Sequence, residues 1–398
     1  MKILILSFYY PPDLSAGSFR IFGLVNALME RANKDLQIEV ITTHPNRYDG
    51  FGASVSAEEA DERLKIHRIK IPKHNSAMLG QARSFFFYAF EAQKIIKNQQ
   101  YDFIFSTSSR LMTAALGAWV SKSKNAPLYL DIRDIFVDTI QDVLSKKVAY
   151  LLTPIFSLIE RFTIERATHI NLVSPGFESY FKARYPKKSF SYYMNGIDEE
   201  FVTNNRQIEK INDKKENSSL PLHILYAGNL GEGQGLHKIV PQFAKKLGDR
   251  VTLRLIGGGG RLKELEDTLR FMDVHNVEVV PPMPRIDLIR EYESADILFL
   301  HLNNYEAFKK VLPSKIFEYA ALGKPILAGV SGYAAQFLSQ EVQNCAIFTP
   351  CDVDGAVKAF ESLSTHYINR DKFVEKFLRK NIMNNLSEDM ISRFEEKR

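Results

Sequence analysis

The sequence predicts an α/β protein built from two Rossmann-like domains, each a doubly wound parallel sheet. Three observations predict this fold class: the length of 398 residues, the alternation of apolar strands with amphipathic helices through both halves, and one polar break between the halves. A chain of this length exceeds what one hydrophobic core usually organises. Strands that alternate with helices form parallel sheets with helices on both faces.

In the first half, short apolar segments fit buried strands, and helical segments separate most of them. The strand segments are Lys2–Tyr9, Leu36–Thr43, Leu64–Ile71, Tyr101–Ser106, Pro127–Asp131, His169–Ser174 and Ser189–Met194. In the first helical segment, Ile21, Leu24, Val25 and Leu28 recur at the i, i+3, i+4, i+7 spacing of one buried face. We therefore expect a first domain over residues 1–205.

A charged, polar stretch, RQIEKINDKKENSS, breaks the pattern at residues 206–219. Such composition is typical of a linker between domains. We place the boundary there and expect a second domain over residues 220–375, followed by helices at 376–398 that pack back toward the first domain.

The second half repeats the alternation of strand and helix. Its strand segments are Leu222–Ala227, Val251–Ile256, Val277–Val280, Ile297–Leu300, Pro325–Gly329 and Ala346–Thr349. Its first helix carries Leu236, Ile239, Val240, Phe243 and Leu247 on one stripe, and from Asp352 onward the pattern is helical throughout. Ligands bind outside the carboxyl ends of such strands, so we expect the site in a cleft where the two domains face each other.

The composition limits the choice of partner and compartment. Lys and Arg number 52 against 47 Asp and Glu, a net charge of +5, which suits a phosphorylated ligand but gives no basic run for nucleic acid. Two cysteines, Cys345 and Cys351, cannot build a disulfide framework or a metal site, which fits a reducing cytoplasm. The opening MKILILSFYYPP is too short for a signal peptide, and no apolar stretch reaches the ~20 residues of a spanning helix.

Charged and small residues follow two strands of the first half. Gly17 precedes a helix whose start could meet an anion, and Arg20 follows it; a plain strand-to-helix turn with a solvated arginine is the alternative. Asp131, Arg133 and Asp134 stand at the end of a strand, where charges are costly unless they face a cleft or pair with each other. We expect Asp131, Arg133 and Asp134 to form hydrogen bonds to the hydroxyl groups of a sugar or of a second substrate, with an internal Arg–Asp pair that holds a loop as the alternative.

Two glycine-rich segments follow strands of the second half. The first, YAGNLGEGQG, contains Gly228, Asn229 and Gln234 just before a helix. The second, IGGGGR, contains Gly257 and Arg261. Glycine lets the backbone approach a ligand closely, so both segments are candidates for a phosphate or sugar cradle, with a flexible loop as the alternative for the second.

The segment LPSKIFEYAALGKP predicts a short helix, with Ser314 as its N-cap and Gly323 as its C-terminal stop. Lys315 and Glu318 lie at i, i+3 on one face. Lys315 beside a helix N-terminus can hold a diphosphate, and Glu318 can accept hydrogen bonds from two ribose hydroxyls. The alternative is an ordinary surface Lys–Glu pair.

Five segments together resemble the family 4 retaining glycosyltransferases of the GT-B fold, and they keep that family's order. They are YYMNGIDEEF, YAGNLGEGQGL, IGGGGRLKELE, YESADILFLHL and PSKIFEYAALGKPILA. The opening FYYPPDLSAGSFR and the segment DIRDIF resemble the branch of O-antigen fucosamine-transferase-like enzymes. The resemblance covers nearly the whole chain.

The resemblance also shows departures. The family's Glu-x7-Glu motif places its second, ribose-binding Glu at Glu318, but the first falls on Lys310, with Lys309 and Glu306 nearby. Asn229 and Gln234 stand where the family often has Arg and Lys, which leaves the diphosphate to Lys315, backbone N–H groups, Arg20 or Arg261. The pair Arg133–Asp134 stands where the family commonly has an acceptor-side His.

The resemblance implies a hexosyltransferase-type enzyme that moves a sugar from a UDP-linked donor to a hydroxyl with retention, and needs no metal or other cofactor. Lys315, Arg133 and Asp134 are the expected catalytic residues. The donor would contact Gly17, Gly228, Asn229, Gln234, Gly257, Arg261, Ser314, Lys315 and Glu318. The acceptor would contact Arg20, Asp131, Arg133 and Asp134.

The implied setting is bacterial O-antigen or capsule synthesis. The expected acceptor is a polyprenyl-diphosphate-linked saccharide or another saccharide, and the expected location is the cytoplasm, at the inner membrane's cytoplasmic face. Residues 73–90 and 144–166 combine basic and apolar side chains that could rest on a bilayer, or be core helices with solvated ends. A GT-B sugar-nucleotide epimerase and a non-catalytic nucleotide-sugar-binding protein are the alternative functions.

Overall fold

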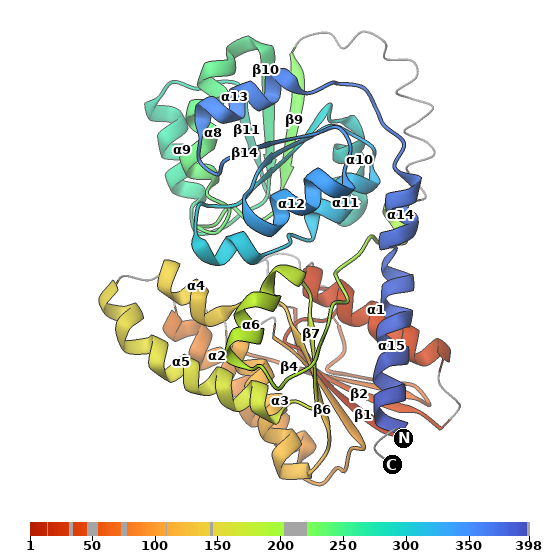
Figure 1. Cartoon of the computed structure of the whole chain (residues 1–398). Coiled ribbons are helices and arrows are strands. Elements are labelled where there is room, and N and C mark those ends of the chain that lie inside the picture. Colours follow the sequence, from red (N-terminus) through yellow and green to blue (C-terminus); the bar gives the residue numbers. More distant parts are fainter. Residues whose placement is uncertain are drawn as a thin grey trace. The chain divides into compact units, whose positions relative to one another are not determined.

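A computed structural model of the chain describes residues 1–13, 15–31, 35–45, 55–72, 78–108, 110–143, 146–202 and 221–395. The chain divides into two compact units, Met1–Asn195 with Arg379–Arg398, and Gly196–Leu378 (Figure 1). The division therefore falls at Asn195 and again at Leu378. The linker predicted at residues 206–219 lies outside the described residues.

The first unit is a sheet with helices on both faces. Its strands are β1 (Lys2–Leu6), β2 (Gln37–Thr43), β3 (Glu58–Ala60), β4 (Leu64–Ile69), β5 (Phe103–Thr107), β6 (Leu128–Ile132), β7 (His169–Leu172) and β8 (Phe190–Ser191). Its helices are α1 (Ala16–Arg31), α2 (Met78–Ile96), α3 (Leu111–Lys124), α4 (Phe136–Val143), α5 (Lys146–Arg166), η1 (Pro175–Phe177), α6 (Glu178–Arg184) and α15 (Arg379–Glu395).

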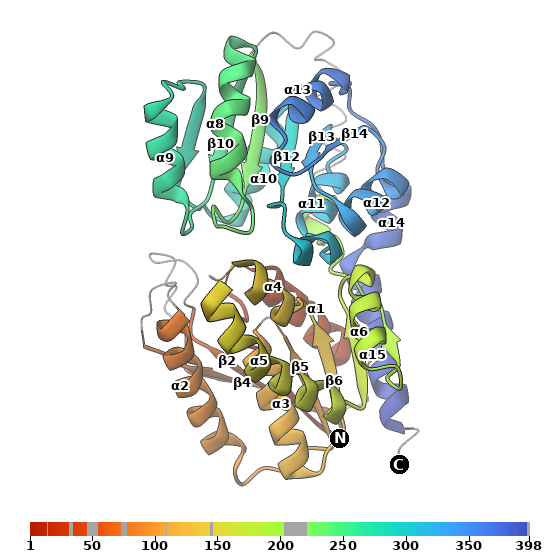
Figure 2. The same ribbon diagram turned by 60° about the vertical axis from the view of Figure 1, so that its left-hand side comes forward.

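Among the described residues, the first sheet has the order β3-β4-β2-β1-β5-β6-β7-β8, and only β3 runs antiparallel. Helices α1 and α15 pack together on one face, where Leu24 and Leu28 meet Met383 and Leu386 in one apolar core. Helices α2, α3 and α5 lie next to one another elsewhere on the unit (Figures 1 and 2). The four apolar residues predicted for the inner face of the first helix are all buried.

The second unit repeats this plan. Its strands are β9 (Leu222–Ala227), β10 (Val251–Ile256), β11 (Val277–Val280), β12 (Ile297–His301), β13 (Ile326–Gly329) and β14 (Cys345–Phe348). Its helices are α8 (Leu236–Leu247), η2 (Gly248–Arg250), α9 (Leu262–Phe271), α10 (Arg285–Ser294), η3 (Glu306–Lys310), α11 (Lys315–Ala321), α12 (Gly332–Glu341), α13 (Val353–Ser362) and α14 (Asp371–Phe377).

The second sheet is parallel, with the order β11-β10-β9-β12-β13-β14. The chain starts in the middle at β9, builds outward to β11, and then returns to place β12 on the other side. The carboxyl ends of β9 and β12 therefore flank a topological switch point, the usual ligand crevice in such sheets. The stripe predicted on the first helix of this half, now α8, is fully buried against the sheet.

Several predicted strands are longer than the observed ones, and the segment Ser189–Met194 shows why. Only β8, Phe190–Ser191, pairs with β7. Beyond it, the Tyr193 N–H donates to the side-chain oxygen of Asn171 at 2.7 Å, and the carbonyls of Tyr193 and Met194 accept from Arg20. Side chains thus form hydrogen bonds with the backbone groups that a longer strand would have used to pair with its neighbour.

Candidate functional site

Two glycine turns meet at the carboxyl ends of β9 and β10. Gly228 and Gly257 have φ of 152° and 151°, a backbone region that other residues rarely adopt. A Cβ on Gly257 would lie 1.8 Å from the Gly228 carbonyl oxygen, so only glycine permits this approach. The Leu230 N–H donates to the Gly258 carbonyl at 2.9 Å, which ties the two loops together.

Lys315 lies directly over the first of these turns. A Cβ on Gly228 would lie 2.6 Å from Lys315 Cε and 2.7 Å from its Nζ. The ammonium group is 6.0 Å from the centre of the Tyr226 ring, and the Tyr226 hydroxyl donates to the Asn229 carbonyl at 2.9 Å. The structure therefore brings predicted donor residues Gly228, Gly257 and Lys315 together at the switch point.

Helix α11 carries Lys315 and Glu318. Ser314 stands at its N-cap position, as predicted, but the Ser314 backbone is helical and its side chain makes no capping hydrogen bond. The predicted stop at Gly323 is confirmed, because its φ is 68° and a Cβ there would meet the Tyr367 ring at 2.2 Å. The Tyr319 hydroxyl, from the same helix, accepts the Ala227 N–H at 3.3 Å, which anchors α11 to the end of β9.

Glu318 shares its surroundings with an arginine that the sequence did not single out. Arg285, at the start of α10, pairs with Asp198 at 2.5 Å and Glu200 at 2.6 Å, and its guanidinium lies 5.1 Å from the Phe201 ring. Burial lowers the pKa of Arg285, but the carboxylates of Asp198, Glu318 and Glu200 outweigh that effect and raise it. The predicted ribose-binding carboxylate of Glu318 is thus one of the charges that act on the Arg285 guanidinium.

Glu232 occupies the centre of the first glycine-rich loop. Its carboxylate pairs with Arg261 at 2.6 Å and Lys238 at 3.3 Å, and accepts a hydrogen bond from the Tyr305 hydroxyl. Burial raises the pKa of Glu232, but the hydrogen bonds from Tyr305, Lys238 and Arg261 prevail and lower it to about 2. Arg261, predicted to contact the donor, is therefore engaged by Glu232 and also by Glu264 at 2.7 Å.

His301, at the end of β12, forms hydrogen bonds with the same loop and with Cys351. Its Nδ1 lies 2.6 Å from the Gln234 carbonyl, and its Nε2 accepts the Cys351 N–H at 3.0 Å. These contacts require the neutral tautomer with the proton on Nδ1. Burial lowers the pKa of His301 to about 4, which keeps the ring neutral. Of the predicted donor residues on this loop, Asn229 and Gln234 bond each other through their side chains at 2.8 Å.

In the first unit, the structure assigns Arg20 and Asp131 a structural place. Both side chains are 0% exposed and form a bidentate pair, with distances of 2.9 and 2.7 Å. Arg20 also donates to the Met194 and Tyr193 carbonyls, and Asn171 donates to Asp131 at 2.8 Å. The expected acceptor contact by Arg20 and Asp131 is corrected accordingly, because a sealed pair cannot reach a ligand. Gly17 is likewise buried, in the first turn of α1.

Arg133 and Asp134 follow β6 at the carboxyl end of the first sheet. The Arg133 N–H donates to Ser108 Oγ at 2.9 Å, and the exposed Asp134 carboxylate accepts the Ile135 N–H at 2.9 Å. Asp134 and Ser108 also line a small cavity of about 10 Å³, room for one water molecule. These two predicted residues thus lie at the carboxyl edge of the first sheet, the edge where ligands bind in such sheets.

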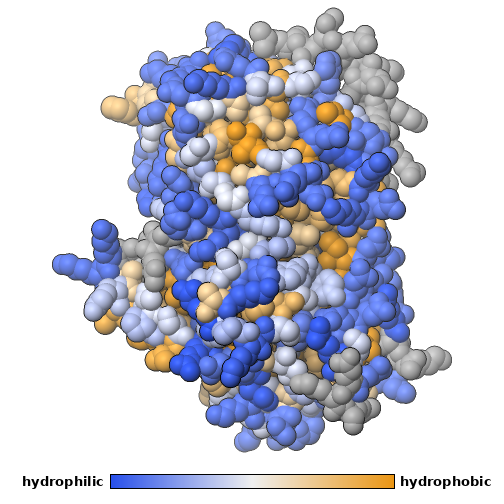
Figure 3. Space-filling model, in the orientation of Figure 1, coloured by the Kyte–Doolittle hydropathy of each residue, from blue (hydrophilic) through white to orange (hydrophobic). Residues whose placement is uncertain are grey.

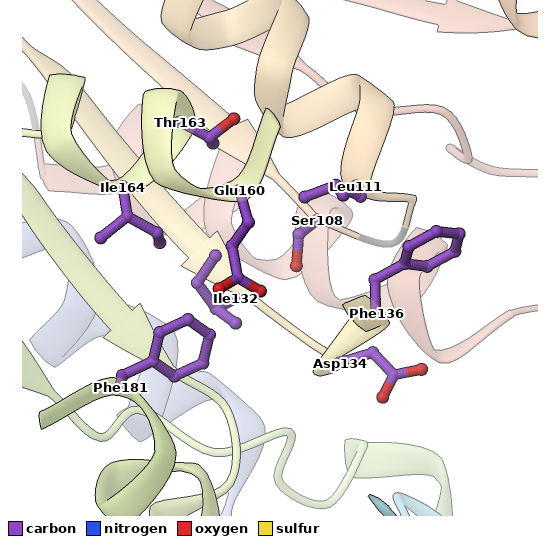
Figure 4. Close-up of a pocket in the computed structure, with 9 residues that line it drawn as sticks. All are labelled: Ser108, Leu111, Ile132, Asp134, Phe136, Glu160, Thr163, Ile164 and Phe181. Atoms are coloured by element: carbon purple, nitrogen blue, oxygen red, sulfur yellow. The ribbon is translucent and has the colours of Figure 1, made fainter. Parts of the chain in front are cut away.

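A third acidic residue, Glu160 of α5, lines the same cavity (Figure 4). Its carboxyl group points toward the space beside Ser108, whereas the Asp134 carboxylate points away from it. Glu160 accepts hydrogen bonds from the Tyr180 and Tyr185 hydroxyls at 3.1 Å. Burial raises its pKa, although the hydrogen bonds from Tyr185 and Tyr180 partly offset that effect.

Sequence reasoning missed Arg285, Glu232, His301 and Glu160. A signal existed for Glu160, a lone acid in the apolar run SLIERF, and for Glu232, an acid inside a glycine-rich loop. No local signal marks Arg285 or His301, because their partners come from other strands and loops. Across the described ranges, no three His, Cys, Asp or Glu side chains gather as a metal site would require.

Residues 207–378 match the family model described as glycosyl transferases group 1. The matched residues fall within the second unit, Gly196–Leu378. They include both glycine turns, Lys315 and Glu318, so the family match and the candidate donor site coincide. A search of the curated proteins found no match.

Solved structures share the fold over the whole chain. Anabaena Alr3699/HepE in complex with UDP and glucose is 15% identical with a TM-score of 0.68, and the match covers 98% of this chain and 99% of that one. WaaG, a glycosyltransferase involved in lipopolysaccharide biosynthesis, is 14% identical with a TM-score of 0.63, covering 100% and 98%. The catalytic domain of starch synthase IV from Arabidopsis thaliana, bound to ADP and acarbose, is 14% identical with a TM-score of 0.63, covering 99% and 98%. The fold is thus GT-B with two Rossmann-like domains, and the residues that match the group 1 glycosyl transferase model lie in the second domain.

Proposed function

We propose that this chain transfers a sugar from a UDP-linked donor to an acceptor hydroxyl, with retention at the anomeric carbon. The observation that carries the proposal is the position of Lys315 over the Gly228 turn, at the switch point of the second sheet. A diphosphate there would meet an ammonium group and two glycine turns that offer backbone at close range.

The donor half of the reaction needs stabilisation of a departing diphosphate. Lys315 would neutralise charge as the bond from the anomeric carbon to the diphosphate breaks. Glu318, one helical turn further, would accept hydrogen bonds from the ribose hydroxyls. Arg285, anchored by Asp198 and Glu200, would add positive charge to the surroundings of that carboxylate.

Two further basic side chains lie at the glycine-rich loop that follows β9, and both form ion pairs there. Arg261 and Lys238 both contact Glu232. A diphosphate that approached the loop would compete with Glu232 for them. This exchange would compensate for Asn229 and Gln234, which carry no charge where the resemblance leads one to expect Arg and Lys.

The acceptor half is assigned to Arg133 and Asp134 of the first unit. Both follow β6, at the carboxyl edge of the sheet, and both would position the acceptor hydroxyl. The proposal requires no metal and no other cofactor, since Lys315 and backbone N–H groups supply the electrostatic stabilisation.

The biological setting is proposed from the comparisons and the resemblance to O-antigen fucosamine-transferase-like enzymes. Anabaena Alr3699/HepE was solved with UDP-glucose, and WaaB is a lipopolysaccharide outer core galactosyltransferase. These two similar proteins support a UDP-sugar donor and a role in bacterial surface polysaccharide synthesis. A polyprenyl-diphosphate-linked saccharide at the cytoplasmic face of the inner membrane is the proposed acceptor.

A donor panel tests the proposal directly. UDP-, GDP- and dTDP-sugars are added to the purified protein, and the melting temperature is recorded, because a ligand that binds the folded state raises it. We expect selective stabilisation by UDP-sugars, unchanged by EDTA, and a product with the donor's anomeric configuration by NMR. No stabilisation by any nucleotide sugar would refute the donor site, and an inverted anomer would refute retention.

A further inference from the structure

Exposed apolar side chains gather on three helices of the first unit. Thirteen large hydrophobic residues are exposed among the described residues, and ten of them lie on α2, α3 and α5. They are Phe86, Phe87, Phe90, Trp119, Val148, Tyr150, Leu151, Ile155, Leu158 and Phe162. Scattered exposed apolar residues are ordinary, but a cluster on neighbouring helices indicates an interaction surface.

The spacing on α5 forms one continuous stripe. Val148, Leu151, Ile155, Leu158 and Phe162 follow intervals of three and four residues, so they share one face of the helix. Leu151 and Leu158 are 70% and 68% exposed. The opposite face, which includes Ala149 and Ile164, is buried in the unit. The stripe is therefore an outward face that the protein's own core does not require.

Helix α2 repeats the arrangement with aromatic residues. Phe86, Phe87 and Phe90 are exposed, whereas Phe85 and Tyr88 are buried beneath them. Arg83 lies one turn before this group and Lys94 one turn after it on the same face. The Lys94 ammonium is 4.5 Å from the centre of the Phe90 ring. Basic side chains thus flank the aromatic group at both ends.

The three helices are also where the chain's positive charge lies. Together α2, α3 and α5 contain eight basic and three acidic residues, a net charge of +5 that equals the net charge of the whole chain. The three acids are already engaged: Glu91 pairs with Lys94, Glu165 pairs with Arg161, and Glu160 is buried against Tyr180. The outer surface is therefore apolar and cationic. Figure 3 shows orange atoms beside blue ones where α5 lies, at the left of the view.

We propose that the outer faces of α2, α3 and α5 dock on a bilayer that contains anionic phospholipid. Apolar side chains of such helices enter the acyl boundary while Lys and Arg meet the headgroups. Charge selects this occupant over a second copy of the chain, since two such surfaces would bring like charges together. No helix among the described residues has the length and apolar character to cross a membrane, so this contact would be interfacial.

The inference deepens the proposed function and rests on it for one point only, that the acceptor is carried by a lipid. Docking would place the enzyme on the surface where such an acceptor lies. Vesicle binding itself is measured without donor or acceptor, so its result and that of the donor panel are independent.

Sedimentation of the full chain with vesicles tests the proposal. Vesicles of phosphatidylethanolamine and phosphatidylglycerol are compared with vesicles of pure phosphatidylcholine. Three sets of substitutions address the surface: F86S/F87S/F90S, L151S/I155S/L158S and K146Q/K147Q. The matched control is F271S/I286S, which removes two exposed apolar side chains from helices α9 and α10 of the second unit.

We expect binding to the anionic vesicles alone, with weaker binding at high salt. Each apolar set should weaken it by about tenfold or more. K146Q/K147Q should weaken it by roughly fivefold for each charge removed. The control should bind as the wild type does, and all variants should keep the UDP-induced rise in melting temperature.

Equal binding by the variants and the control would overturn the proposal. So would a concentration-dependent dimer in sedimentation velocity that L151S/I155S/L158S abolishes, because the stripe would then be covered by a second copy. If UDP did not raise the melting temperature of the wild type, the donor site would be refuted, but the conclusion from vesicle binding would be unaffected.

Discussion

Replacing Gly257 by alanine should disable the donor site, whereas the same change at its neighbour Gly258 should not. The Gly257 backbone has φ of 151°, and a Cβ there would lie 1.8 Å from the Gly228 carbonyl oxygen. A Cβ on Gly258 would meet nothing within 4 Å. The two substitutions are adjacent and chemically identical, so they isolate the close approach of the turns.

The backbone region alone costs about 1–3 kcal/mol for a residue other than glycine. The clash adds to this cost unless the Gly228 turn moves, and that movement would displace Lys315 above it. For a unit of this size, such a loss lowers the melting temperature by roughly 3–10 °C. Gly258→Ala should be neutral or stabilise by about 0.4–1 kcal/mol, because it restricts only the unfolded chain.

Thermal unfolding and UDP titration of both variants provide the assay. We expect Gly257→Ala to melt earlier and to bind UDP at least about tenfold more weakly, which corresponds to 1.4 kcal/mol. Gly258→Ala should melt no earlier than the wild type and should bind UDP with the wild-type affinity. Equal melting temperatures and equal UDP affinities for the two variants would refute the reasoning that the stacked turns form the donor cradle.

Three other predictions concern charged or titratable side chains that hold loops and strands together within each unit. Arg20→Met leaves the Asp131 carboxylate buried and unpaired, so urea unfolding should show a loss of about 3–5 kcal/mol, and an unchanged midpoint would place the pair at the surface. The pKa of His301 falls from 6.5 to about 4 on folding, so its contribution is complete above pH 6.5 and is lost as the pH drops toward 4. Unfolding at pH 7 and pH 4.5 should therefore differ less in His301→Gln than in the wild type, and an equal difference would contradict the burial argument. Glu232→Gln removes the competitor for Arg261 and should tighten UDP binding roughly fivefold in calorimetry, whereas weaker binding would show that the carboxylate mainly holds the loop.

Much of the fold could be predicted because the strands of the second half end at residues that terminate strands. Leu222–Ala227, Val251–Ile256 and Val277–Val280 have the predicted bounds, since each is an apolar run that ends at glycine or proline. The edge strand Glu58–Ala60 was missed, because its three residues are exposed and carry no apolar signal. Its ion pairs, such as that between Glu59 and Arg68, appear only in three dimensions.

The candidate site was predicted where chemistry is local and missed where it is not. The glycine turns and Lys315 were identifiable because backbone freedom and a helix start are encoded in neighbouring residues. Arg20 and Asp131 are 111 positions apart, and nothing in either segment shows that they neutralise each other. Arg285 likewise depends on Asp198, 87 positions away.

Calorimetric titration of UDP into Lys315→Ala tests the central claim most directly, with Lys263→Ala on the exposed face of α9 as the control. The account predicts that losing this charged contact to the diphosphate weakens UDP binding by about 10–100-fold and leaves uridine binding unchanged. An affinity for UDP equal to that of the wild type would contradict it, because the ammonium over the Gly228 turn would then not face the diphosphate.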